Sequence, residues 1–159
     1  MRRSGRITAN AAFLCAEHRS QFSQISDRND IQSISDSNAI IALFKGHAGF
    51  LARVRRYQPQ DFGVPSIMAH KLYYGAYKWQ RTLESLARVE ALAFEVLEFD
   101  REDARAAGEL RASLAKAGTP IGPYDVLIGG QAVARELTLV THDRSEFQRV
   151  EGLRIEDWE

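Results

Sequence analysis

Residues 121–147, IGPYDVLIGGQAVARELTLVTHDRSEF, predict a helix that leads directly into a buried strand. Pro123 suits the first turn of a helix, where its missing N–H leaves no hydrogen bond unmade. The apolar run LTLV at 137–140 is short and unbroken, which is typical of a parallel strand buried on both faces. Asp125 lies in the predicted first turn, and Asp143 follows the strand. The segment therefore predicts a helix–strand unit that carries two carboxylates.

A third carboxylate, Asp36, follows a second predicted strand at 31–35. In open parallel sheets, functional side chains gather just beyond the carboxyl ends of the strands. If the two strands are neighbours, right-handed connections bring Asp36 and Asp143 to one edge of the sheet. The alternative is that Asp125 caps its helix and Asp143 lies in a solvated loop.

Strands and helices alternate along the rest of the chain. Predicted strands cover 31–35, 62–65, 94–99, 137–140 and 153–155. Predicted helices cover 39–44, 47–57, 67–77, 82–93, 101–117 and a segment that begins at 123. This alternation predicts an α/β fold, with a parallel central sheet of four to five strands and helices on both faces. Trp158 is expected to pack the last strand onto the core.

The composition bounds the class of protein. A chain of 159 residues with 45% hydrophobic and 26% charged residues is expected to form one globular domain with a substantial core. Basic and acidic residues balance at 21 each, so no overall positive field points to nucleic acid. The single cysteine, Cys15, excludes an internal disulfide and a cysteine-based zinc site. Apolar runs are too short for a membrane-spanning helix, and we expect a cytoplasmic protein.

Residues 1–30 differ from the rest of the chain. Much of this part is polar and aperiodic, rich in Ser, Gln, Asp and Asn. The composition predicts a poorly ordered N-terminal extension, which leaves residues 31–159 as the folded domain. The alternative is a targeting signal, because an arginine-rich start precedes a short apolar stretch. Polar residues interrupt that stretch and no small-residue cleavage site follows it, which favours the extension.

Carboxylates gathered at one sheet edge repel one another unless a cation lies between them. Mg²⁺ prefers oxygen ligands and is usually held by one or two carboxylates, waters and substrate phosphates. A metal held in this way can clamp a phosphodiester and activate a water for attack on phosphorus. The acids therefore indicate a metal-dependent phosphoryl-transfer enzyme. An aspartyl-phosphate domain would need a second acid two residues after the nucleophile or paired acids before it, and neither accompanies Asp36.

Four segments resemble the motifs of PIN-domain ribonucleases, in the order in which that family has them. They are DSNAIIALFKG at 36–46, LYYGAYK at 72–78, GTPIGPYDVLI at 118–128 and LVTHDRSEFQRVEGL at 139–153. The resemblance covers residues 31–159, which would form a PIN domain. It is greatest to the VapC-type toxins of bacterial toxin–antitoxin pairs.

The resemblance implies a PIN-like fold and a metal-dependent endoribonuclease toxin that hydrolyses RNA phosphodiester bonds. It implies Mg²⁺ or Mn²⁺ as the cofactor, held by the catalytic acids Asp36, Asp125 and Asp143. It also gives Ser37 and Asn38 the role of supporting the site. The implied partners are a cognate VapB-like antitoxin, an RNA substrate and a second copy of the chain in a homodimer, with no membrane.

Position 71 departs from the family pattern. The second motif normally has an acidic residue directly before LYYGA, where this chain has Lys71. An ammonium cannot ligate Mg²⁺, and between Asp36 and Asp125 it would occupy the space that the metal needs. Two charges about 4 Å apart interact by about 4 kcal/mol at an effective dielectric near 20, so metal affinity is expected to fall steeply.

We therefore expect Lys71 to attenuate the nuclease. Two alternatives remain open. The first is a catalytically inactive PIN-fold module that engages an antitoxin or RNA without cleaving it. The second is that Lys71 is an ordinary solvent-facing lysine on a helix.

Several other side chains have both a functional and a structural interpretation. Tyr73, Tyr74 and Tyr77 either stack on RNA bases or pack in a core or dimer interface. His142 either contacts substrate or is solvated, and Glu146 is near enough to Asp143 to assist a metal through a water. Five basic residues either contact RNA phosphates or belong to solvated helix faces: Arg53, Arg55, Arg56, Lys78 and Arg81.

Overall fold

The computed structural model describes residues 31–57, 61–78, 80–92 and 94–158, and nothing is described of the Ser37 side chain. The extension predicted at 1–30 lies outside these residues. The strands are β1 (Ser33–Ser35), β2 (Phe62–Pro65), β3 (Glu95–Leu97), β4 (Thr138–Val140) and β5 (Arg154–Glu156). The helices are α2 (Ser37–Lys45), α3 (Ala48–Val54), α4 (Ser66–Lys78), α5 (Thr82–Glu90), α6 (Arg101–Lys116), α7 (Pro123–Ala134) and α8 (Arg144–Phe147).

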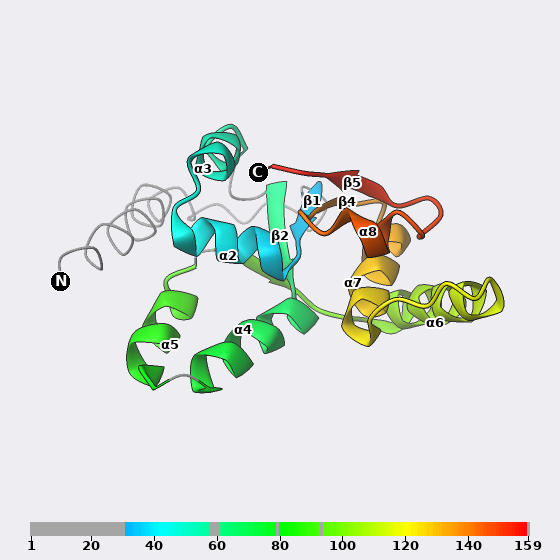
Figure 1. Ribbon diagram of the computed structural model, residues 1–159, viewed down its shortest axis with the longest axis horizontal. Coiled ribbons are helices and arrows are strands. Elements are labelled where there is room, and N and C mark those ends of the chain that lie inside the picture. The colour runs from blue at the N-terminus through cyan, green and yellow to red at the C-terminus, as the bar shows by residue number, and fades with distance from the viewer. Residues whose placement is uncertain (1–30, 58–60, 79, 93, 159) are drawn as a thin grey trace.

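The strands form one five-stranded sheet in the order β3-β2-β1-β4-β5, and every neighbouring pair is parallel. This confirms the predicted parallel sheet. It also shows that β1 and β4, whose adjacency the sequence left open, are neighbours that lie side by side in Figure 1. Ser35 pairs with Val140 in the register of these two strands. The residues that follow, Asp36 and Thr141, therefore leave the sheet next to each other.

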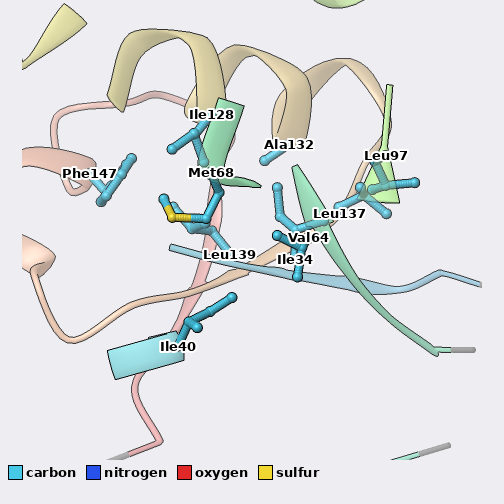
Figure 2. Packing of buried hydrophobic residues seen from close by; sticks show 10 residues of the cluster. All are labelled: Ile34, Ile40, Val64, Met68, Leu97, Ile128, Ala132, Leu137, Leu139 and Phe147. Carbon is cyan, nitrogen blue, oxygen red and sulfur yellow. The ribbon is translucent and has the colours of Figure 1, made fainter. Parts of the chain in front are cut away.

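Helices cover both faces of the sheet, as predicted. Successive strand residues point to opposite faces, and Leu139 and Val140 accordingly belong to different core clusters. Leu139 packs with α4 and α7 through residues such as Met68 and Ile128, as Figure 2 shows. Val140 packs on the other face with residues of α2 and α3, including Phe50. Each face therefore has its own apolar core.

Trp158 anchors the C-terminal end of the chain, as predicted. Its ring centroid lies 4.7 Å from that of Tyr57 in a stacked arrangement and 5.6 Å from those of Phe50 and Phe62. Its indole N–H donates to Oε2 of Glu156 at 2.7 Å. The indole thus holds β5 against the α3 side of the core.

The predicted elements have the right order but several wrong ends. β1 and β3 are shorter than the strands predicted at 31–35 and 94–99, and α3 is shorter than the helix predicted at 47–57. After Val54 the backbone closes into tighter turns, with Arg56 and Tyr57 bonding three residues back. The pattern of apolar residues indicates where a helix or strand lies, whereas its ends depend on where the backbone hydrogen bonds stop.

Helices α6 and α7 pack so closely that Gly130 has no room for a side chain. A Cβ added there would lie 2.6 Å from the Cβ of Ala107. Within the described ranges no helix has the length and apolarity that crossing a bilayer requires.

A buried polar network also joins these two helices. Asp103 is 1% exposed, and its carboxylate accepts two hydrogen bonds from Arg135, at 2.9 Å from Nε and 2.6 Å from Nη2. Gln131 donates to the same carboxylate at 2.9 Å. Asp100 caps α6 and donates its backbone N–H to Asp103 at 3.0 Å. The buried charge of Asp103 is thus fully paired.

Candidate active site

Asp36 follows β1 directly and is the N-cap residue of α2. Its backbone N–H donates to the Val140 carbonyl at 3.2 Å, which attaches it to the end of β4. The buried carboxylate accepts hydrogen bonds from the Ala39 N–H at 2.9 Å and from the Thr141 hydroxyl at 2.6 Å. The same side chain therefore lies at the predicted site and holds two elements together.

Burial raises the pKa of the Asp36 carboxyl, because the ionised form loses water. Hydrogen bonds from Thr141 and from the Ala39 and Asn38 backbones oppose this shift by favouring the ionised form. The positive charge of Lys71 lowers the pKa in the same way. Asn38 thus contacts Asp36 through its backbone while its side chain is exposed, and the supporting roles of Ser37 and Asn38 stay predictions.

Replacing Asp36 tests its role in the fold. We expect Asp36→Ala to lower the free energy of unfolding by about 1–3 kcal/mol, because α2 loses its cap and the Thr141 hydroxyl loses its acceptor. Asp36→Asn keeps a capping oxygen and should lose less. Urea denaturation followed by circular dichroism measures both, with Asp143→Ala at an exposed position as the control. Equal unfolding midpoints for Asp36→Ala and the natural chain would show that α2 does not depend on this cap.

Asp125 lies half-buried in the first turn of α7, as predicted. It does not cap that helix, because the Gly122 N–H donates instead to Oε2 of Glu146 in α8 at 2.8 Å. A Cβ added to Gly122 would lie 2.5 Å from Oδ2 of Asp125 and 3.5 Å from Oε2 of Glu146. Both carboxylates therefore crowd this glycine.

Several neighbours act on the Asp125 carboxyl. Burial raises its pKa, and the positive charge of Lys71 lowers it. The negative charge of Glu146, a hydrogen bond with that residue and the negative charge of Asp36 raise it further. The two predicted acids Asp36 and Asp125 therefore lie within electrostatic reach of each other.

Sequence reasoning underrated Glu146 and missed Thr141. The sequence suggests contact through a water for Glu146, whereas the structure places its carboxylate beside Asp125. Thr141 bonds to both Asp36 and the backbone N–H of Asp143. The position of Thr141 in the sequence could have indicated its role. It directly follows β4 as Asp36 directly follows β1, and these two strands pair in register.

Lys71 lies in α4 and acts on both acids, lowering the pKa of Asp36 and of Asp125. It is only partly exposed, and its Nζ lies 5.8 Å from the ring centroid of Tyr124, the residue before Asp125. Lys71 therefore belongs to the surroundings of the acids. A lysine that faced only solvent would not have these neighbours.

Asp143 lies at the carboxyl end of β4 as the N-cap residue of α8. It is exposed, and its Oδ1 accepts from the Ser145 hydroxyl at 2.7 Å. Its backbone N–H donates to the Thr141 hydroxyl oxygen at 3.0 Å, and Thr141 in turn donates to Asp36. The sheet thus brings Asp36 and Asp143 to one edge and links them through Thr141, while the Asp143 carboxylate is engaged with Ser145.

The donor set is poorly suited to a tightly held metal. Asp36 and Asp125 offer the carboxylate oxygens that Mg²⁺ and Mn²⁺ prefer. Among the residues that the structure describes, however, no three Asp, Glu, His or Cys side chains are arranged to hold an ion. The positive charge of Lys71 also opposes a divalent cation beside these acids. In this arrangement the residues do not fit a strongly bound Mg²⁺ or Mn²⁺.

The other side chains singled out in the sequence have different surroundings. His142 pairs with Asp157, with 3.2 Å between Nδ1 and Oδ2. The Tyr73 hydroxyl donates to Glu90 at 2.6 Å and so ties α4 to α5. Tyr74 and Tyr77, in contrast, are 60% and 65% exposed, so they are not core residues.

Comparisons with known proteins identify the family. The sequence pattern of the PIN domain matches residues 34–153. The chain is 38% identical to the tRNA(fMet)-specific endonuclease VapC of Salmonella typhimurium, over 77% of this chain and 95% of that protein. It is 42% identical to the protein of the same name from Shigella flexneri, over 60% of this chain and 74% of that protein.

Solved structures agree with these relatives. The chain superposes with a TM-score of 0.77 on one from the DNA-bound VapBC of Salmonella typhimurium, at 36% identity, covering 81% of this chain and 99% of that one. The TM-score is 0.75 for VapBC2 from Rickettsia felis bound to a DNA fragment from its promoter, at 25% identity, covering 81% and 100%. The chain with its parallel sheet and edge acids therefore belongs to the PIN-domain family, in the VapC branch.

Proposed function

We propose that this chain is an endoribonuclease toxin of the VapC kind, with hydrolysis of RNA phosphodiester bonds as its reaction. The proposal rests chiefly on one observation: Asp36 lies at the carboxyl edge of the sheet, within electrostatic reach of Asp125, and the family resemblance gives both positions to catalytic acids. The Salmonella and Shigella relatives are named as tRNA(fMet)-specific endonucleases, so this tRNA is the first substrate to test.

The proposed cofactor is Mg²⁺ or Mn²⁺, with Asp36, Asp125 and Asp143 as catalytic and metal-binding acids. These residues would hold the ion, which when bound would supply electrostatic stabilisation of the phosphate. Lys71 opposes the binding of a cation, so we propose weak metal affinity and, as its consequence, attenuated cleavage. Support comes from the effect of Lys71 on the buried Asp36 and the half-buried Asp125.

A second candidate function is a PIN-fold binding module that engages RNA or an antitoxin without cleaving. The arrangement of donors favours it, because no three potential metal ligands are grouped within the described ranges. The two candidates differ in one measurable respect, the formation of metal-dependent RNA cleavage products.

The proposed protein partner is a VapB-like antitoxin, because the structural neighbours are VapBC assemblies. A groove of about 460 Å³ between α2, α4 and α5 offers such a partner an apolar surface. Ile41, Phe44, Leu72 and Val89 line it, and Lys71 lines it too, so a bound segment would lie beside the acids. A homodimer and a cytoplasmic location complete the proposal, both taken from the family.

Cleavage of tRNA(fMet) by the purified chain tests the nuclease. We expect slow cleavage that requires Mg²⁺ or Mn²⁺, stops with a chelator and falls at least about tenfold in Asp125→Asn, because that variant loses a carboxylate charge beside the metal. Gel analysis of labelled tRNA measures it, with Glu109→Gln at an exposed position of α6 as the control that also removes one carboxylate charge. Cleavage unchanged in Asp125→Asn would reveal a contaminating nuclease. RNA binding without any cleavage would favour the binding module.

A further inference from the structure

We propose that a stripe of aromatic and basic side chains on α4 and α7 binds unpaired nucleotides that flank the reacting phosphate. The aromatic stripe consists of His70, Lys71, Tyr74, Tyr77, Lys78 and Tyr124. The inference rests on the proposed RNA substrate, and it adds a path that the strand follows away from the acids.

The stripe is continuous from the acids outward. Positions 70, 74 and 77 recur about one turn apart and so share a face of α4. Tyr124 extends this face onto α7, because its ring centroid lies 5.7 Å from that of His70. Tyr124 directly precedes Asp125, so this end of the stripe lies at the site. In Figure 1 the start of α4 lies near α7 and its end runs toward α5.

The rings of the stripe are available to a ligand. Tyr74, Tyr77 and Tyr124 are 60%, 65% and 43% exposed. The Nζ of Lys78 lies 5.7 Å from the ring centroid of Tyr74, which places a cation beside an open aromatic surface. Proteins that bind single strands combine these two elements, since bases stack on rings and phosphates pair with cations. Stacking also requires bases that are not already paired in a duplex.

The local charge suits a polyanion. No acidic residue occurs between Asp61 and Glu84, whereas Lys71 and Lys78 of the stripe lie in this interval, in a chain with zero formal net charge. The eight helical steps from His70 to Lys78 extend about 12 Å along the axis. At about 3.4 Å per nucleotide of a stacked strand, this length matches three to four nucleotides. Charge and length together favour a short unpaired RNA segment over a protein partner on this face.

Binding of a defined RNA to the full chain in a chelating buffer tests the stripe without cleavage. The probe is a fluorescein-labelled oligouridine of about twelve nucleotides, long enough to overhang the stripe, compared with the same strand in a duplex. We expect Tyr74→Ala, Tyr77→Ala and Tyr124→Ala each to weaken binding of the single strand about tenfold, because each removes a stacking surface. The duplex should bind less tightly and respond less to these changes.

Conservative variants separate stacking from general apolar contact. Tyr74→Phe keeps the ring and should retain affinity, whereas Tyr74→Leu should lose it. Lys78→Gln should reduce the slope of log affinity against log salt by about 0.7, the value for one phosphate contact on a single strand. Matched controls are Leu83→Ala on α5, which is 85% exposed, and Lys116→Gln on α6, and both should bind like the natural chain.

Two results would overturn the inference. One is RNA affinity unchanged in all three tyrosine variants. The other is a shift of sedimentation toward monomer in Tyr74→Ala and Tyr77→Ala with RNA affinity retained, which would make the face an interface between copies. A positive result is photocross-linking of 5-bromouridine RNA to peptides that contain Tyr74, Tyr77 or Tyr124.

This test is independent of whether the chain is a nuclease. RNA binding that depends on the stripe, without RNA cleavage when Mg²⁺ or Mn²⁺ is added, would contradict the proposed nuclease activity but not the proposed binding surface. Metal-dependent cleavage by the natural chain, together with unchanged RNA affinity in the tyrosine variants, would contradict the proposed stripe but not the proposed nuclease activity.

Discussion

Lys71→Glu is expected to raise both metal affinity and RNA cleavage above those of the natural chain. The change removes a positive charge beside Asp36 and Asp125 and adds a carboxylate ligand in its place. One charge pair about 4 Å apart contributes about 4 kcal/mol at an effective dielectric near 20. Since about 1.4 kcal/mol corresponds to a factor of ten, Mn²⁺ affinity should rise at least about a hundredfold. Calorimetric titration with Mn²⁺ measures the affinity, and tRNA cleavage at limiting metal should rise in parallel.

Two further variants separate the effects of charge and ligation. Lys71→Gln removes the positive charge without adding a carboxylate and should recover only part of the metal affinity. Lys78→Glu makes the same charge change on the same helix, two turns away, and should change metal affinity little. Strong cleavage by the natural chain, with no gain in Lys71→Glu, would contradict attenuation. No metal binding in Lys71→Glu would show that the remaining acids are not a metal site.

Arg135→Ala is expected to lower the free energy of unfolding by about 3–5 kcal/mol, because it leaves a buried carboxylate without its main partner. Arg135 makes two hydrogen bonds to Asp103 and also donates to the Glu98 carbonyl at 2.7 Å. The paired geometry is the strong form of an arginine–carboxylate contact. A shift of the unfolding midpoint in urea measures the loss.

The control for this prediction is an exposed arginine–carboxylate pair on α6. Arg105 lies 3.2 Å from Glu102, and both side chains are largely exposed, so Arg105→Ala should cost less than about 1 kcal/mol. The double variant Arg135→Met with Asp103→Leu should regain much of the stability, since replacing both partners removes the unpaired charge. Equal losses in Arg135→Ala and Arg105→Ala would show that burial of Asp103 does not matter.

The sequence predicted the order of the elements because each strand is a short apolar run between turn residues. The alternation of strands and helices predicted a parallel sheet but not which strands are neighbours, so the pairing of β1 with β4 came from the structure. Element ends were less predictable, because they depend on hydrogen bonds to neighbours distant in the sequence. The network around Asp103 shows the same limit: Arg135 follows it by 32 residues, and the contact exists only because α6 and α7 pack together.

The site was predictable to the level of residues but not of contacts. Asp36, Asp125 and Lys71 could be placed near one another from strand ends, helix starts and the family pattern. The contact of Glu146 with Gly122 could not, because it depends on how α8 packs against α7. The direction of the Asp143 side chain was not predictable either, because its carboxylate accepts a local hydrogen bond from the Ser145 hydroxyl.

Substitutions at Asp36 and at position 71 differ in what they do to the fold. A substitution of Asp36 by a residue without a hydrogen-bond acceptor removes a helix cap and the acceptor of a buried hydrogen bond from Thr141, so it weakens the fold. Position 71 lies inside α4, which begins at Ser66, and caps no helix. A substitution at position 71 therefore alters the charge beside Asp36 and Asp125 without removing a helix cap. Because a single codon sets that charge, the electrostatics of the site can change and revert independently of the stability of the fold.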